Sequence, residues 1–181
     1  MRLRVCSLFL MAMLIVSIQQ VSAAQYLKLS NNLDRPKDGY CLDVQGVVGH
    51  FRADKPIVAH NCKRGVAADG LVRFANEEFI LFPAFGWCLT AMGTANTVLP
   101  GTSLMIKPCE EQGLFASSDI HKRFKFNKQN QLKLSSFDLC LVVGTESAPT
   151  FSAADRWRTL FLDTCSTAPL ARSQWEFKTI Q

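Results

Sequence analysis

The sequence lacks both a long hydrophobic run and closely spaced cysteines. The longest apolar run, from Leu8 to Ile18, is much shorter than the roughly 20 residues that a transmembrane helix needs. Structural zinc sites usually hold two cysteines roughly two to four residues apart, and no two of the seven cysteines are that close. We therefore expect neither a membrane span nor a zinc site.

The chain also has little of the chemistry that enzymes use. Its three histidines, His50, His60 and His121, stand in no repeated relation to a cysteine. No pair of carboxylates, no Ser/His/Asp arrangement and no spacing typical of metal ligands is repeated along the sequence. We therefore expect a non-enzymatic protein with no cofactor and no metal site.

A large excess of one charge is absent as well. The chain has 20 Lys and Arg residues against 15 Asp and Glu residues, and the basic residues are scattered. The densest basic run is Lys122-Arg123, flanked by His121 and Lys125, and such a short run is typical of a solvated strand face. A specific anionic partner for this run is the alternative. The balance gives no reason to expect a nucleic-acid partner.

The start of the chain has the pattern of a secretory signal peptide. Arg2 and Arg4 are followed by the apolar run, and Val21-Ser22-Ala23 offers small residues for cleavage. We predict a signal peptide over residues 1–23 and one mature domain over 24–181, secreted to an extracellular or periplasmic space. A retained signal anchor is the alternative.

The six cysteines of the mature chain form three pairs with repeated spacing. The two members of each pair are 21, 21 and 25 residues apart. An exported chain with this pattern indicates a disulfide framework, and only pairing within each repeat lets three copies keep the same local geometry. We predict three disulfides, Cys41–Cys62, Cys88–Cys109 and Cys140–Cys165.

Short segments that alternate apolar and polar residues surround every cysteine pair. Each repeat has four such segments, which predicts twelve strands, and no window shows a sustained helical period. The repeats cover roughly residues 25–76, 77–127 and 128–181, and three equal sets of four strands favour a barrel with threefold pseudo-symmetry. The irregular stretches from Asn31 to Lys37 and from Thr145 to Asp155 should be surface loops.

Two motifs give the sequence a specific resemblance. Gly-Tyr-Cys-Leu-Asp-Val at 39–44 and Ser-Gln-Trp-Glu-Phe at 173–177, together with the paired cysteines, resemble the ricin B-type lectin family. The resemblance covers essentially the whole mature chain and implies an all-β fold, a β-trefoil of three four-stranded repeats with three intra-repeat disulfides. The chain departs from the family at the glutamine of the closing motif, which is replaced by Val72, Lys122 and Ser173 in the three repeats.

The resemblance also implies what a sugar site would need in each repeat. The family uses an aspartate two residues after the first cysteine, an aromatic residue two before the second, and an amide near the closing motif. A carboxylate suits this role because it can accept several hydrogen bonds from sugar hydroxyls. The first repeat has Asp43 and His60 at the first two positions, with Gln45, Asn61 and Arg73 as candidate neighbours.

The other two repeats differ at both positions. The second repeat has Thr90 and Lys107, and the third has Val142 and Asp163. We therefore expect at most one sugar site, in the first repeat.

Each candidate residue also has an ordinary structural interpretation. Asp43 would then bond to the backbone in the turn that follows Val44, and His60 would be an exposed strand residue. Trp157, in the long loop of the third repeat between Arg156 and Arg158, is another candidate contact for a glycan or a protein partner, unless it packs back onto the barrel.

Three functions are compatible with the sequence. The first is a secreted carbohydrate-binding module whose partner is a glycan or glycoprotein. The second is an adaptor or cell-attachment subunit of a secreted toxin complex, which binds a secreted protein partner and no sugar. The third is a hydrolase inhibitor that uses a loop such as the one from Thr145 to Asp155.

Overall fold

The computed structural model describes residues 24–47, 49–76, 78–110 and 119–179. The predicted signal peptide over residues 1–23 lies outside the described residues. Within the described ranges, no helix is long and apolar enough to cross a membrane.

The predicted strands are present in three sets of four. The first repeat holds β1 (Gln25–Leu29), β2 (Tyr40–Asp43), β5 (Val58–Asn61) and β6 (Leu71–Ala75). The second holds β7 (Phe79–Phe82), β8 (Trp87–Ala91), β9 (Leu104–Pro108) and β10 (Phe124–Phe126). The third holds β11 (Leu132–Leu134), β12 (Leu139–Val143), β14 (Arg156–Thr164) and β15 (Trp175–Lys178).

A few short elements lie between these strands. They are β3 (Gly46–Val47), β4 (His50–Phe51), β13 (Ala148–Pro149) and two 3₁₀ turns, η1 (Asp119–His121) and η2 (Leu170–Arg172). The expectation of little helix is met in the described part of the chain.

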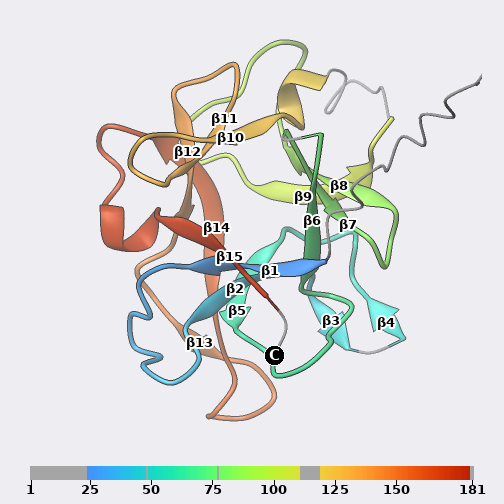
Figure 1. The fold of residues 1–181 in the computed structure, drawn as a ribbon, viewed down its shortest axis with the longest axis vertical. Coiled ribbons are helices and arrows are strands. Elements are labelled where there is room, and N and C mark those ends of the chain that lie inside the picture. The colour runs from blue at the N-terminus through green and yellow to red at the C-terminus, as the bar shows by residue number, and fades with distance from the viewer. Residues whose placement is uncertain (1–23, 48, 77, 111–118, 180–181) are drawn as a thin grey trace, which may run out of the picture.

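Six of the strands close into a barrel, and Figure 1 shows β1 and β15 lying side by side within it. Strand β1 pairs with both β6 and β15, β6 pairs with β7, and β10 pairs with β11, all antiparallel. Single bridges, Phe79 to Arg123 and Gln131 to Gln174, complete the ring.

The other six strands form three hairpins, β2–β5, β8–β9 and β12–β14, one for each repeat. Each hairpin is closed by one of the three predicted disulfides, and the Cα atoms of the bridged cysteines are 4.9 Å apart in all three. A six-stranded barrel with three hairpins is the β-trefoil architecture, so the predicted fold is confirmed.

The core is built from the apolar residues of the alternating segments. Leu27, Leu29 and their counterparts Ile80, Phe82, Leu132 and Leu134 are fully buried. Trp175 of the closing motif is also buried, and its indole Nε1 donates a hydrogen bond to the Leu141 carbonyl oxygen at 3.0 Å.

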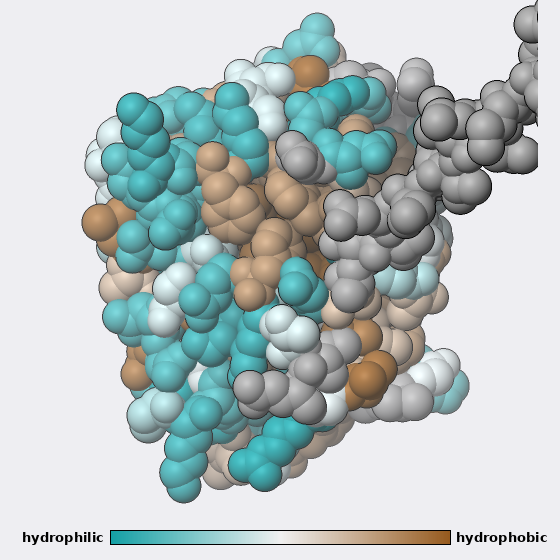
Figure 2. Space-filling model, viewed as in Figure 1, coloured by the Kyte–Doolittle hydropathy of each residue, from teal (hydrophilic) through white to brown (hydrophobic). Residues whose placement is uncertain are grey.

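One aromatic ring from each repeat joins a partly buried cluster of Phe74, Phe126 and Phe177, whose centroids are 5.6 to 6.3 Å apart. Figure 2 shows apolar atoms gathered near the middle of the face that it views, with hydrophilic side chains around them.

The basic run near residue 122 differs from the sequence expectation. His121 and Lys122 are buried rather than solvated, and the Lys122 Nζ donates a hydrogen bond to the Cys109 carbonyl oxygen at 2.9 Å. Arg123 forms ion pairs with Glu78 and Asp119. These residues lie in and after the turn η1, which folds against the second hairpin, so the run is not a free basic surface.

The third hairpin is asymmetric because β14 extends well beyond its partner. Leu160 to Thr164 pair with β12, whereas Trp157 to Thr159 pair with β5 of the first repeat. Trp157 is therefore a strand residue and not part of the long loop in which the sequence interpretation placed it. This extension joins the first and third repeats.

Candidate functional site

The candidate site lies on the outer face of three adjacent strands, β2, β5 and β14. His60 pairs with Cys41 on one side and Trp157 on the other, and Val58 likewise pairs with Asp43 and Thr159. Residues directly opposite each other on neighbouring strands share a face, as do residues two apart on one strand. The strand register therefore brings Asp43, His60 and Trp157 to the same face.

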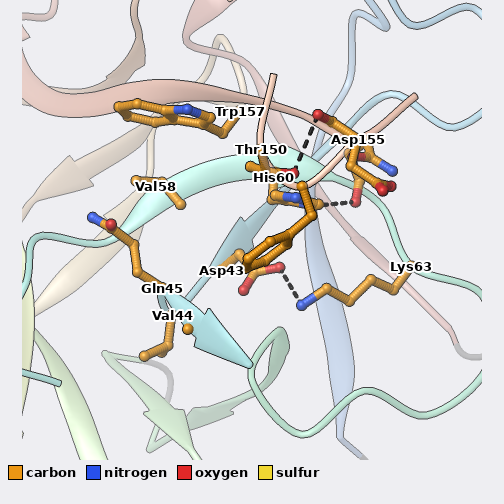
Figure 3. Close-up of a pocket in the computed structure, with 12 residues that line it drawn as sticks. Asp43, Val44, Gln45, Val58, His60, Lys63, Thr150, Asp155 and Trp157 are labelled. Atoms are coloured by element: carbon orange, nitrogen blue, oxygen red, sulfur yellow. Dashed lines mark hydrogen bonds and ion pairs between the residues drawn. The ribbon is translucent and has the colours of Figure 1, made fainter. Parts of the chain in front are cut away.

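These three side chains line one cavity of about 410 Å³, called the sugar-site cavity below. In Figure 3, Asp43 and His60 lie between Lys63 on one side and Trp157 on the other. The remaining lining residues are Val44, Gln45, Gly46, Val58, Asn61, Thr150, Phe151 and Asp155. The wall from 150 to 155 belongs to the long loop of the third repeat.

Asp43 is 5% exposed, and its main partner is a lysine. Its Oδ2 lies 2.8 Å from the Lys63 Nζ, which also pairs with Asp69. Burial raises the pKa of Asp43 to about 7; the attraction of Lys63 opposes this shift and the nearby Asp69 adds to it. Lys63 is thus the ion-pair partner of two buried carboxylates, Asp43 and Asp69.

The alternative interpretation of Asp43 required hydrogen bonds from the backbone of the turn after Val44. No such bond is formed within the described ranges, where the partner of Asp43 is Lys63. Sequence reasoning missed Lys63 and Asp69. A signal for Lys63 was present, because it directly follows Cys62, whose disulfide to Cys41 brings it near Asp43.

His60 is half-buried and presents an imidazole ring without charge at neutral pH. Burial lowers its pKa below the usual 6.5, with a smaller opposing effect from the Asn61 carbonyl. The His60 Nδ1 lies 3.1 Å from that carbonyl oxygen, which requires Nδ1 to carry the proton. The ring is therefore held in one orientation at the cavity wall.

Of the three other predicted site residues, Gln45 and Asn61 line the cavity and Arg73 does not. The Gln45 Nε2 donates to the Pro56 carbonyl oxygen at 2.7 Å. Asn61 accepts a hydrogen bond from the Arg156 backbone N–H at 3.0 Å. Both residues line the cavity, but these contacts occupy part of their amide groups. Arg73 does not line it, because it lies on barrel strand β6 opposite Leu81.

Trp157 and the loop beside it are held by a polar network under the sheet. The Arg158 guanidinium donates to Asp34 at 2.7 Å and to the Gly144 carbonyl oxygen at 2.9 Å. The Ser147 hydroxyl also donates to Asp34, at 2.7 Å. The ion pair and these hydrogen bonds hold the pKa of Asp34 well below its usual range, although burial acts against them. The network fixes the loop that forms the cavity wall.

The equivalent positions in the other hairpins have no such chemistry. Thr90 is fully buried, and its hydroxyl donates to the Cys88 carbonyl oxygen at 3.1 Å. Val142 is buried and apolar. Asp163 accepts a hydrogen bond from the Thr164 backbone N–H at 2.8 Å. Among the described residues, no three His, Cys, Asp or Glu side chains gather so as to hold a metal ion.

Comparisons with known proteins bear on the fold. No protein-family model matches the sequence, and no curated protein matches it. The solved mdaA-1 domain has a TM-score of 0.59 and 16% identity, over 87% of this chain and 90% of that chain. An agglutinin from Abrus precatorius has a TM-score of 0.59 and 19% identity, over 90% of this chain.

The chain spans about half of the agglutinin chain, 51% of its length. At such identities the likeness shows the fold alone. It agrees with the β-trefoil built by the strand pairings, and it gives the chain a fold similar to that of an agglutinin.

Proposed function

We propose that this protein is a secreted, non-enzymatic carbohydrate-binding module with a single sugar site in the sugar-site cavity. The observation that carries the proposal is the shared outer face of β2, β5 and β14, with a carboxylate, an imidazole and an indole around one hollow. Sugars have an apolar ring face and a rim of hydroxyl groups, and this combination of side chains suits both.

In this proposal each side chain has a distinct role. The indole of Trp157 supplies a rigid apolar surface for one face of a sugar ring. Asp43 Oδ2 is bonded to Lys63, which leaves Oδ1 to accept hydrogen bonds from sugar hydroxyls. The uncharged ring of His60 adds apolar contact between them.

The loop from Thr145 to Asp155 supports the carbohydrate proposal over the inhibitor alternative. Thr150, Phe151 and Asp155 line the cavity, and the network around Asp34 holds the base of the loop against the body. An inhibitory loop would have to enter a foreign active site, whereas this loop serves as a wall of its own domain.

A shallow site of this kind binds one sugar with a Kd of about 1 mM, which is about 4 kcal/mol. A higher overall affinity then requires several such sites that bind one glycan surface at the same time. We therefore expect binding to be visible on dense glycan surfaces and weak for free monosaccharides.

The test is a dense glycan array probed with the mature protein and matched variants. Trp157→Ala and Asp43→Asn should each reduce the signal about tenfold or more. Lys107→Ala and Thr90→Val change the equivalent positions of the second hairpin and should leave the signal unchanged. Circular dichroism confirms that each variant is folded. Wild-type signal in both site variants would contradict the proposed site, and an array without any signal would contradict the function.

A further inference from the structure

A second cavity, of about 710 Å³, adjoins the sugar-site cavity, and five of its twelve lining residues are basic. Asn61, Lys63 and Asp155 line both cavities, so the two share a wall. The basic residues of the second cavity, called the basic pocket below, are Arg35, Lys37, Lys63, Arg64 and Lys178.

Three separate chain segments bring these cations together. Arg35 and Lys37 lie between β1 and β2, Lys63 and Arg64 follow β5, and Lys178 is on β15, where it pairs with Tyr26 of β1. The Cys41–Cys62 disulfide anchors the second segment. The Tyr26 hydroxyl steadies it further, by donating to the Gly65 carbonyl oxygen at 2.9 Å.

Positive charge in the pocket exceeds the negative charge that could neutralise it. Two carboxylates, Asp38 and Asp155, line it against five cations, and one of these cations, Lys63, is already paired with the buried Asp43 and Asp69. Asp38 is paired with Arg35 at 2.5 Å. No ion pair is formed by Lys37, Arg64 or Lys178 with another side chain in the described ranges, and all three are exposed.

We propose that the basic pocket binds the acidic group of a glycan, a carboxylate or a sulfate, while the adjoining sugar ring occupies the sugar-site cavity. This inference rests on the proposed function and specifies its ligand class as acidic glycans. Arg64 offers a planar fork of donors that matches the oxygens of either group, and the two lysines add mobile charges.

The shared wall gives the geometric reason for one ligand rather than two. A sugar ring beside Asp43 and His60 stands next to Asn61 and Lys63, and the far side of these residues faces the basic pocket. An acidic substituent that leaves the ring in this direction enters the pocket without crossing the sheet. A substituent at the Trp157 end has no cations to meet among the residues that line the sugar-site cavity.

The test compares matched neutral and acidic probes. The mature protein is assayed on a dense array of lactose, 3′-sulfolactose and 3′-sialyllactose, and inorganic sulfate serves as a soluble competitor. Exposed charge pairs are individually weak, so the three together should favour the acidic probes about tenfold, which corresponds to about 1.4 kcal/mol. The preference should fall as sodium chloride is raised, because salt screens exposed charges.

Two triple variants separate the pocket from overall charge. Lys37→Gln, Arg64→Gln and Lys178→Gln together should abolish the acidic preference and leave lactose binding intact. The control removes the same charge from exposed lysines outside the pocket, Lys55→Gln, Lys125→Gln and Lys128→Gln, and should keep the preference.

The outcomes distinguish this inference from the proposed function. Lactose bound as tightly as the acidic probes, or a preference that survives in the pocket variant, would overturn the acidic-glycan assignment and leave the module intact. Inorganic sulfate that competes as well as soluble 3′-sulfolactose would indicate a free-anion site and would also overturn it. An absence of signal for every glycan would remove the proposed function itself.

Discussion

The first and second hairpins have the same framework and different chemistry. In both, the bridged cysteines are 21 residues apart in sequence and 4.9 Å apart between Cα atoms. The residue two positions after the first cysteine is a buried Asp43 with a lysine partner in one and a buried Thr90 bonded to its own strand in the other. The repeated framework therefore does not determine where a site forms.

The difference between the hairpins comes from a third strand. The outer edge of the first hairpin is extended by Trp157 to Thr159 of β14, which add a wall and an aromatic ring. At the equivalent edge of the second hairpin, β14 forms a single bridge, from Phe161 to Ser103 just before β9, rather than a ladder of paired residues. Asymmetry between repeats, rather than the repeat itself, creates the candidate site.

The largest effect that would sharpen this comparison is the loss of a disulfide. Removal of either the Cys41–Cys62 or the Cys88–Cys109 bridge, by alanine at both positions, should cost about 3 kcal/mol of unfolding free energy. The two costs should be equal because the closed loops have the same length.

Glycan binding should separate these two variants, because the first bridge lies beside Asp43 and Lys63. Urea denaturation measures the free energy, and the glycan array measures binding below the unfolding transition. Equal loss of binding in both variants would contradict a site confined to the first hairpin.

A smaller effect is the pH dependence of the unfolding free energy that arises from Asp43 in the first hairpin. Its pKa is raised from 3.8 to about 7, so the folded protein binds a proton that the unfolded chain releases between these values. Unfolding free energy should therefore fall as pH rises through this window. A full shift of this size corresponds to roughly 4 kcal/mol, and we expect about 2 kcal/mol of decline between about pH 5 and pH 7.5.

The measurement compares wild type with Asp43→Asn by urea denaturation across that range. The difference between the two proteins isolates Asp43, because the lowered pKa of His60, which acts in the opposite direction below its usual 6.5, is present in both. Thr90→Val in the second hairpin should keep the wild-type pH profile. Parallel profiles for wild type and Asp43→Asn would show that Asp43 titrates normally.

The smallest effect is expected when an aromatic residue is introduced into the second hairpin at the position that matches His60. Lys107 of the second hairpin occupies the position equivalent to His60, and Lys107→Trp would place an aromatic ring there. We expect no gain of glycan binding and a stability change within about 0.5 kcal/mol, as for an ordinary surface substitution. A new array signal that persists in the Trp157→Ala background would mean that β14 is not required.

The architecture was largely predictable from the sequence. The cysteine spacing predicted the three disulfides, and the alternation around Leu27, Ile80 and Leu132 predicted the strands that bury these residues. These predictions succeeded because strand periodicity and loop length are local properties. The basic run at Lys122 was interpreted less well, because whether a polar residue is buried depends on which hairpin folds over it.

The candidate site was only partly predictable. Asp43, His60, Gln45 and Asn61 come together as the repeat pattern suggested, whereas Arg73 lies elsewhere on the barrel. Lys63 is close to Asp43 because it follows the bridged Cys62, whereas Asp69 is brought there by a loop that returns to β2, where the Val44 backbone N–H donates to the Asp69 carbonyl oxygen at 3.0 Å. Trp157 was a separate candidate in the sequence and belongs to the same cavity in the structure.

The sequence by itself determined the number of repeats, the cysteine pairing and the strands that face the core, because each depends on residue type and spacing within one repeat. Only the tertiary structure decided which repeat holds a cavity and what lines it. The register between β14 and β5 sets which side chains line the sugar-site cavity. This register arises from contacts between residues about 100 positions apart, such as Arg156 with Asn61. Such contacts depend on the packing of the whole chain, and no local pattern encodes them.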